Sequence, residues 1–206
     1  YSTIILDEFH ERSLHTDVAL SLVRRLQATT RPDLKLIVMS ATLETRKLED
    51  YLDSPKVFDI PGRTFPIEIE HHQLDPEAAV KKMLKDQRCP QNILVFLPGM
   101  GSIRSLEQNL QNNLPRDIEI VPLHSSLPKK QQNKAFVGDR RKIVLSTNIA
   151  ETSLTIPDVT GVIDLGTERR ASFAPWSGMP LLQLEKISKA SATQRAGRAG
   201  RIQEGI

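Results

Sequence analysis

Residues 92–110 read NILVFLPGMGSIRSLEQNL, and this stretch decides the fold class. The apolar run from Asn92 to Leu97 is typical of a parallel strand buried on both faces. A helical pattern follows, with Ile103, Leu106 and Leu110 at positions i, i+3 and i+7. A buried strand leading directly into an amphipathic helix predicts the repeating unit of an α/β protein.

The same alternation extends in both directions along the chain. Further Ile-, Val- and Leu-rich runs predict strands at residues 2–6, 34–39, 118–123, 142–145 and 159–165. Apolar residues at helical spacing lie between some of these runs, namely Val18, Leu22 and Leu26, and then Val80 and Leu84 after the N-cap pair Asp75-Pro76. We expect doubly wound architecture, whose ligands bind at the carboxyl ends of the strands.

A break in the pattern lies near residues 60–66, which read IPGRTFP. Two prolines and a glycine there predict a domain boundary, with residues 1–60 before it and 61–206 after it. The first piece then has two core strands and a third at 57–60, too few to close a sheet of its own.

Composition describes an ordinary globular protein of 206 residues with a net charge of +3 and a pI near 9.1. This charge permits a polyanionic partner without requiring one. The single cysteine, Cys89, cannot form an intramolecular disulfide, and no stretch is apolar enough for a signal peptide or a membrane span. We expect a free thiol, a cytoplasmic location and no membrane partner.

Carboxylates and hydroxyls follow the first two predicted strands. Asp7 could hold Mg2+ through its water shell and Glu8 could polarise an attacking water, although paired acids are also common in ordinary loops. Ser40 and Thr42 could link a nucleotide site to a neighbouring domain by hydrogen bonds. The alternative for Thr42 is a helix cap before Leu48.

Hydroxyl groups also crowd the loop at residues 146–156, which reads STNIAETSLTI. Such a loop donates hydrogen bonds to phosphates or riboses without reading bases. A capped turn explains one or two hydroxyls but not five. Residues 124–126, His-Ser-Ser, follow another strand and could serve the same phosphate track, although His124 alone is typical of a packed or capping residue.

Residues 194–201 read QRAGRAGR, and their spacing places Gln194, Arg198 and Arg201 on one face of a helix. Small residues between them let that face approach a ligand or another domain closely, so that two guanidinium groups converge on one anion. This pattern predicts an arginine-finger element for a nucleoside triphosphate. The alternative is a solvated basic helix, which usually interleaves Glu and Lys.

Four segments, DEFH, SAT, STNIAETSLT and QRAGRAGR, resemble motifs II, III, V and VI of the DEAH-box helicases in order and spacing. Phe9, the LPG at 97–99 and the APWSG at 174–178 are most similar to the bacterial HrpB-type branch. The resemblance implies a RecA-like fold of the P-loop NTPase type, with parallel sheets. Residues 1–60 would be the C-terminal part of a first, incomplete domain, and 61–206 a nearly complete second domain.

The resemblance also implies site residues. At the nucleotide these are Asp7 for Mg2+, Glu8 for the hydrolytic water, His10 for coupling to the second domain, Phe136 for stacking on the base, Ser153 for sensing nucleotide state, and Gln194, Arg198 and Arg201 for the γ-phosphate. Positions implied to touch the nucleic-acid backbone are Gly99, Ser125, Thr147 and Asn148. Ser40 and Thr42 would couple the domains. Residues 168–183 resemble the hairpin that wedges at a duplex end.

Two departures qualify the resemblance. Pro157 stands where the family often has an acidic residue near the ribose, so a ribose contact is not implied. No lysine follows a glycine, so the chain has no Gly-Lys-Ser/Thr phosphate loop. We expect that loop before Tyr1, and we interpret the chain as a fragment that does not hydrolyse ATP alone.

The expected activity of the intact protein is ATP-dependent helicase or translocase action on single-stranded nucleic acid, RNA rather than DNA, by a monomer that uses ATP and Mg2+. RNA and DNA are not separated by the residues themselves, because the matched positions address backbone and shape. A non-catalytic nucleic-acid-binding module that uses the hydroxyl-rich loop is the alternative function. An inert truncation product with exposed sheet edges is the third interpretation.

Overall fold

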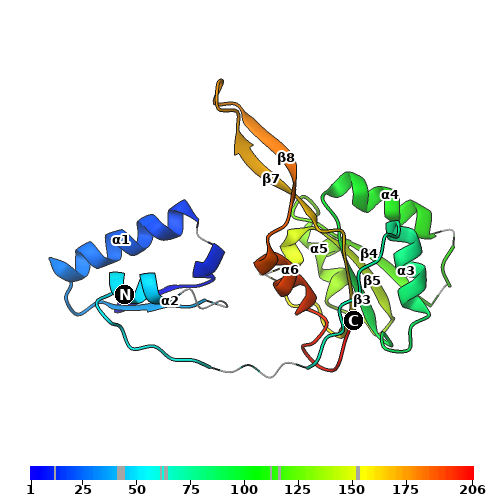
Figure 1. Cartoon of the computed structure of the whole chain (residues 1–206), viewed down its shortest axis with the longest axis horizontal. Coiled ribbons are helices and arrows are strands. Elements are labelled where there is room, and N and C mark those ends of the chain that lie inside the picture. Colours follow the sequence, from blue (N-terminus) through cyan, green and yellow to red (C-terminus); the bar gives the residue numbers. More distant parts are fainter. Residues whose placement is uncertain are drawn as a thin grey trace. The chain divides into compact units, whose positions relative to one another are not determined.

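The computed structural model divides into two compact units, Tyr1–Pro61 and Gly62–Ile206 (Figure 1). It describes residues 1–11, 13–40, 45–60, 62, 65–111, 113–115, 117–151 and 154–206. The boundary between the two units falls between residues 61 and 62 of the sequence, inside the proline- and glycine-containing segment at 60–66.

The first unit is built on two parallel strands, β1 (Thr3–Leu6) and β2 (Lys35–Val38), as the sequence predicts. The connecting helix α1 (Leu14–Ala28) lies along one face of this pair (Figure 1). The Ser13 hydroxyl caps α1 by accepting the Thr16 amide at 3.1 Å. The 3-10 turn η1 (Phe9–Glu11) and helix α2 (Thr45–Tyr51) complete the unit.

The predicted third strand at 57–60 is wrong. These residues form no strand, and the side chains of Val57, Phe58 and Ile60 are 49, 71 and 84% exposed. Apolar composition alone does not make a strand, because the backbone groups of a strand need a neighbouring strand to pair with.

Helix α1 is confirmed, but the apolar repeat that predicts it is not its packed face. Leu20 and Val23 are buried, whereas Val18, Leu22 and Leu26 are 43–55% exposed. The helix is therefore apolar on two sides, and the two-stranded sheet covers one of them.

The second unit has a four-stranded parallel sheet in the order β4-β5-β3-β6. Its strands are β3 (Asn92–Phe96), β4 (Glu119–Leu123), β5 (Lys142–Ser146) and β6 (Val159–Asp164), all close to their predicted positions. The Asn92 side chain fixes the start of the sheet: it accepts the Lys142 amide at 2.8 Å and donates to the Pro157 carbonyl at 2.9 Å.

Both faces of this sheet are covered. On one face, α3 (Pro76–Leu84) and α4 (Met100–Gln111) pack Val80 and Leu110 against Ile93. On the other face, Leu94 and Phe96 lie in a second cluster with residues from the short turns η2 (Asn133–Ala135) and η3 (Asn148–Ala150). The Asp75 cap of α3 is confirmed by its bond from the Ala78 amide at 2.9 Å. The α/β architecture is therefore doubly wound in this unit.

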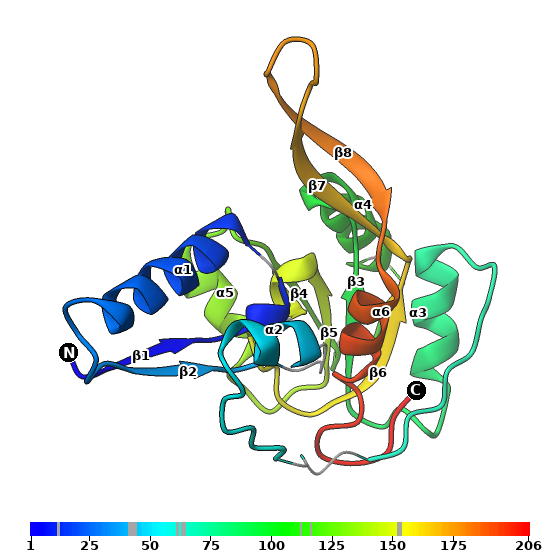
Figure 2. The same cartoon turned by 60° about the vertical axis from the view of Figure 1, so that its left-hand side comes forward.

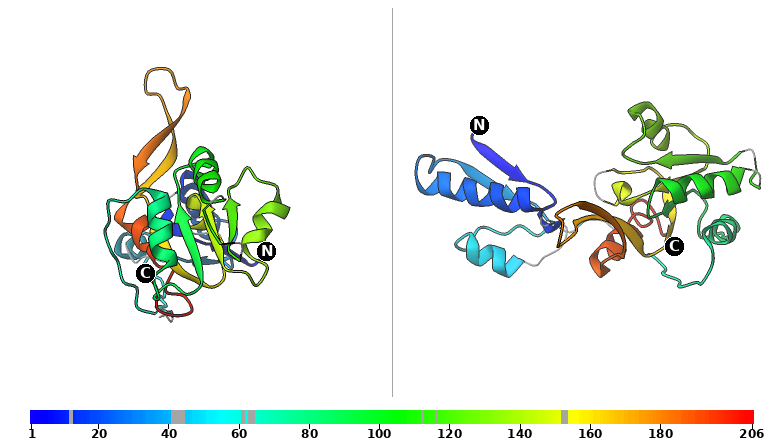
Figure 3. Two further views of the ribbon diagram at one scale, coloured as in Figure 1. Left: turned by 90° about the vertical axis from the view of Figure 1, so that its right-hand side faces the viewer. Right: turned by 90° about the horizontal axis from the view of Figure 1, so that it is seen from above.

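A hairpin of β7 (Thr167–Phe173) and β8 (Pro180–Lys186) follows the sheet and leads into α6 (Lys189–Ala196). It projects away from the sheet of the second unit in Figures 1 and 2 and in the left view of Figure 3. Helix α5 (Lys129–Gln132) is a single turn before η2. Among the described residues no helix combines the length and apolarity that crossing a bilayer requires.

Candidate functional site

The acidic residues of the first unit lie directly after β1, at its carboxyl end. Glu8 has a positive φ of 50°, a conformation that L-residues rarely adopt. Its neighbour Phe9 is 6% exposed, and the Phe9 amide donates to the Met39 carbonyl at 3.0 Å. Burial of Phe9 and this bond therefore hold Glu8 in its strained backbone position, as is common at functional sites.

Asp7 and His10 flank Glu8 closely. The Glu8 amide donates to Oδ1 of Asp7 at 2.8 Å, and Nε2 of His10 lies 3.4 Å from Oε2 of Glu8. Asp7 is exposed, and the described residues contain no cluster of three metal-ligating side chains. One exposed carboxylate suits Mg2+ that keeps its waters and also binds phosphate, but not an ion enclosed by protein.

The predicted coupling residues lie after β2. Ser40 is exposed two residues beyond the end of that strand. Thr42 is outside the described residues. The coupling role therefore stays a prediction.

In the second unit, the predicted nucleic-acid residues come together at one edge of the sheet. Gly99 follows β3, Ser125 follows β4, and Thr147 and Asn148 follow β5. Because these strands are parallel neighbours, their carboxyl ends share one edge. Ser125 and Asn148 are exposed there, whereas Thr147 is 9% exposed.

The predicted continuous helix from Gln194 to Arg201 is wrong, because α6 ends at Ala196. Gly197 is its C-cap, and residues 197–200 form turns. Gln194 is half-buried on the helix, while Arg198 and Arg201 lie beyond it. Gly197 itself keeps a right-handed helical conformation, with a φ of −56°, and the second glycine of the motif, Gly200, serves a close contact with Phe65 and Ile67.

The two arginines nevertheless converge, and they do so on one segment of the same unit. Nη1 of Arg198 donates to the Leu154 carbonyl at 3.0 Å, and Nη1 of Arg201 donates to Oγ1 of Thr155 at 2.7 Å. Residues 154 and 155 end the hydroxyl-rich loop that begins after β5. The segment 197–201, called here the arginine turn, is therefore bonded directly to this loop. Ser153, in the same loop, is outside the described residues.

Phe136 has contacts of the core type that the sequence offers as the alternative to base stacking. It is half-buried, immediately after η2, and packs against the second core cluster. The predicted role in base stacking is untested.

A separate charged cluster lies around Arg88, which pairs with Glu68, Glu70 and Asp86 at 2.6–2.7 Å. Hydrogen bonds from His72, Arg88 and Lys82 lower the pKa of Glu70 to about 2. Arg88 likewise lowers the pKa of Asp86 to about 2. An open hollow of about 640 Å³ beside Arg88 contains none of the predicted site residues.

Comparison with known proteins decides the family. Residues 75–203 match the family described as the helicase conserved C-terminal domain. The chain belongs to this family. It is also 42% identical over 214 residues to the ATP-dependent RNA helicase HrpB of Escherichia coli strain K12, a match that covers 98% of the chain and 26% of that protein.

Solved structures agree with this assignment. The crystal structure of the E. coli DEAH/RHA helicase HrpB matches this chain with a TM-score of 0.88 at 42% identity. The match covers 100% of this chain and 27% of the HrpB chain. A crystal structure of the E. coli DExH-box NTPase HrpB matches with a TM-score of 0.85 at 42% identity, over 26% of its length. The resemblance to the HrpB-type DEAH-box branch and the RecA-like fold class are confirmed. The chain spans about a quarter of the length of these relatives.

One residue of the helicase motif was missed by the sequence interpretation. Arg195 is 1% exposed and pairs with three carboxylates from three other segments. The spacing of the motif indicates only that Arg195 does not share the helical face of Gln194. The acidic partners of Arg195 lie 27–44 residues away in sequence. No local pattern connects such partners.

Proposed function

We propose that the protein is an ATP-dependent helicase or translocase that moves along single-stranded nucleic acid, RNA rather than DNA. The relative named above, an ATP-dependent RNA helicase, supports the choice of substrates. The observation that carries the proposal is the pair of bonds from Arg198 and Arg201 to residues 154 and 155. They make the arginine turn and the hydroxyl-rich loop one connected element.

This connection has a functional consequence. Thr147 and Asn148, at the start of the loop, are the proposed backbone contacts for nucleic acid, and Leu154 and Thr155 hold the arginines at its end. A shift of the nucleic acid at the start of the loop therefore changes the position of the guanidinium groups. Stabilisation of a phosphoryl-transfer transition state depends steeply on such positions.

The nucleotide-facing roles are proposed as follows. Glu8 orients and activates the attacking water, and His10, 3.4 Å from Glu8, couples the site to the second domain. Asp7 would hold Mg2+, which would neutralise phosphate charge when bound. Gln194, Arg198 and Arg201 contact the γ-phosphate. Phe136 stacks on the base, and Ser153 responds to the state of the nucleotide. Ser40 and Thr42 couple nucleotide turnover to movement of the domains.

Gly99 and Ser125 extend the proposed nucleic-acid track along the same sheet edge as Thr147 and Asn148. We also propose a cytoplasmic location, which the buried free thiol of Cys89, the chain's one cysteine, supports. A monomer is proposed separately.

The test is nucleic-acid-stimulated ATP hydrolysis by the longest natural polypeptide that contains these 206 residues. Thr155→Val removes the hydroxyl that holds Arg201 at 2.7 Å, and we expect kcat to fall about 10-fold or more. Thr193→Val is the matched control, because among the described residues the Thr193 hydroxyl bonds within α6 alone, to the Lys189 carbonyl at 3.0 Å.

Equal activity of the two variants would contradict the proposed link between loop and arginines. Salt-dependent binding of single strands without any ATP hydrolysis would instead favour a binding module.

A further inference from the structure

Arg195 is the centre of a buried ionic cluster that the proposed catalytic roles do not use. Each of its three guanidinium nitrogens contacts a different carboxylate: Nε contacts Glu151 at 2.8 Å, Nη1 contacts Asp164 at 3.0 Å and Nη2 contacts Glu168 at 3.2 Å. The guanidinium carbon also lies 4.8 Å from the centre of the Phe96 ring. A planar guanidinium can serve three partners in this way, whereas a lysine ammonium has one nitrogen.

The partners of Arg195 belong to separate parts of the second unit. Glu151 follows η3 in the hydroxyl-rich loop, Asp164 ends β6, and Glu168 is the second residue of β7. Arg195 itself lies one turn before Arg198. The cluster therefore joins the loop, the end of the sheet and the base of the hairpin to the element that leads into the arginine turn.

Two further bonds fasten the base of the hairpin at the same place. Oδ1 of Asp164, which binds Arg195, also accepts the Gly166 amide at 2.9 Å. The Ile187 amide, directly after the end of β8, donates to the Gly166 carbonyl at 3.0 Å. Gly166 has a φ of 68°, which glycine adopts without strain. The turn into the hairpin is thus held from both of its sides.

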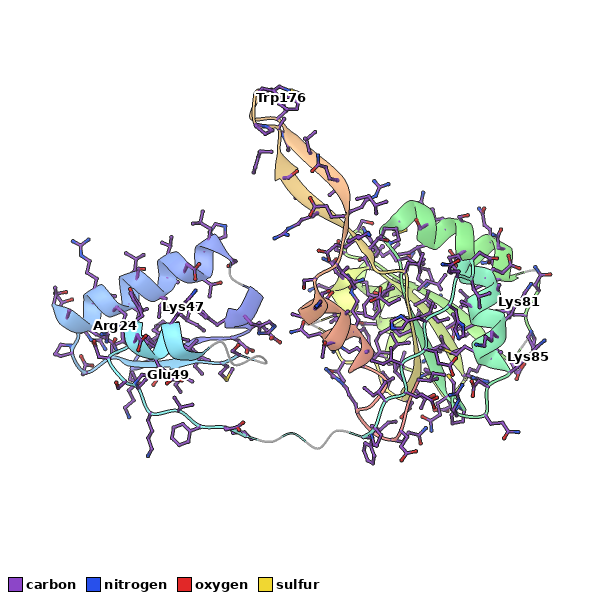
Figure 4. The ribbon with its side chains drawn as sticks, viewed as in Figure 1. Arg24, Lys47, Glu49, Lys81, Lys85 and Trp176 are labelled. Carbon is purple, nitrogen blue, oxygen red and sulfur yellow. The ribbon has the colours of Figure 1, made fainter. Side chains whose placement is uncertain are left out.

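Beyond its base the hairpin is mostly exposed, and a further contact comes from the Arg169 side chain of β7, which lies against Gly99. Its tip is open, with Phe173, Trp176 and Met179 being 72, 88 and 64% exposed. Figure 4 shows Trp176 at the far end of the hairpin. A two-stranded hairpin is marginally stable in isolation, so the orientation of this one depends on its base.

We propose that Arg195 is a positioning residue that locks the base of the β7–β8 hairpin to α6 and the hydroxyl-rich loop. The hairpin then moves together with the arginine turn and not independently of it. The functional part of this inference, coupling of the hairpin to ATP turnover, rests on the proposed function. The mechanical part does not.

The test uses Glu168→Gln, because removal of buried Arg195 would leave three carboxylates unpaired and could prevent folding. Glu168→Gln weakens the hairpin arm of the cluster and leaves Glu151 and Asp164 bound to Arg195. Glu185→Gln is the matched control, since Glu185 lies directly across the hairpin from Glu168 and has no ion pair within the described part of the chain.

Trp176 is the chain's one tryptophan, so its fluorescence reports on the hairpin tip in the 206-residue chain. In Glu168→Gln we expect the amplitude of its nanosecond anisotropy decay to rise about twofold, and in Glu185→Gln to stay unchanged. Labelling of buried Cys89 at the wild-type rate would show that the core of both variants is intact. An unchanged decay in Glu168→Gln, or an equal rise in both variants, would overturn the proposal.

A second measurement addresses coupling in the longest natural polypeptide that contains the chain. Glu168→Gln should lower the number of base pairs separated per ATP hydrolysed, and Glu185→Gln should not. Looser hairpin motion with an unchanged ratio would refute coupling and leave the mechanical lock in place. Absence of ATP hydrolysis in the wild type would refute the proposed function, again without affecting the fluorescence result.

Discussion

Substitution of Gly200 by alanine is expected to destabilise the second unit through the turn that carries Arg198 and Arg201. A Cβ at this position would lie 2.7 Å from the Phe65 carbonyl oxygen and 2.8 Å from Cγ1 of Ile67. The Phe65 amide also donates to the Gly200 carbonyl at 2.9 Å, so the two segments cannot separate without loss of this bond. Overpacking of this kind costs about 1–3 kcal/mol.

Gly101→Ala is the matched control within the same unit. Gly101 lies in the first turn of α4, and a Cβ there would meet no atom within 4 Å. Alanine is favoured over glycine in a helix by about 0.5–1 kcal/mol, so the same substitution is expected to stabilise. The change in the free energy of unfolding is therefore expected to have opposite signs in the two variants, because only the Cβ at residue 200 meets other atoms.

Labelling of Cys89 with a thiol reagent measures the stability of this unit specifically. Cys89 is the chain's single cysteine, is fully buried, and has its pKa raised by that burial. When reclosing is faster than labelling, the rate follows the free energy of opening. A loss of about 1–3 kcal/mol predicts labelling about 5- to 150-fold faster in Gly200→Ala, whereas Gly101→Ala should label more slowly than wild type. Labelling of Gly200→Ala at the wild-type rate would refute the packing argument.

Three further predictions concern single residues. Asn92→Ala should lower the free energy of unfolding by about 1–3 kcal/mol, measured by urea denaturation, because it leaves the buried Lys142 amide without its acceptor. Arg88→Gln should lower the free energy of unfolding in a pH-dependent way. Arg88 lowers the pKa of Asp86 from 3.8 to about 2, so the interaction stabilises the fold above pH 3.8, and this stabilisation is lost as the pH falls toward 2. Phe136→Ala should raise the KM for ATP about 5- to 150-fold if the ring stacks on the base.

Each of these has a contrary result. For Asn92→Ala it is a urea midpoint equal to that of the control variant Asn113→Ala. The Asn113 side chain is exposed and bonds to the Asn109 carbonyl, four residues earlier. For Arg88 it is a stability difference from wild type that stays constant between pH 5 and pH 2. For Phe136 it is a loss of stability with an unchanged KM, the result that a purely packed phenylalanine gives.

The sheet of the second unit was predictable because its strands are largely apolar, and two of them, β3 and β5, are buried along their whole length. Such strands are continuous apolar runs, as at 92–97, and each run is legible without its neighbours. The run at 57–60, VFDI, is also mostly apolar but pairs with no strand in the described part of the chain, and pairing partners are not encoded locally. Helix α1 illustrates a related ambiguity, because it has two apolar faces. The sequence does not show which of them packs on the sheet, since this depends on how far the sheet extends.

The candidate site divides in the same way. Residues at strand ends, such as Asp7 and Thr147, were found because the alternation itself places each of them at the carboxyl edge of its own sheet. The helical continuity assumed for Arg198 and Arg201 failed because α6 ends at Ala196 and residues 197–200 form turns, yet their convergence persisted through bonds to residues 154 and 155. The Arg195 cluster depends on carboxylates from distant segments, and a sequence without a structure gives no register between them.

The most direct test of the account is nucleic-acid-stimulated ATP hydrolysis by the longest natural polypeptide that contains this chain, with Arg201→Gln compared with Arg104→Gln. Arg104 is an exposed residue of α4 and controls for the change of charge. The account predicts that Arg201→Gln lowers kcat about 10³-fold or more while Arg104→Gln has wild-type activity. Stimulated hydrolysis of wild-type size in Arg201→Gln would contradict it.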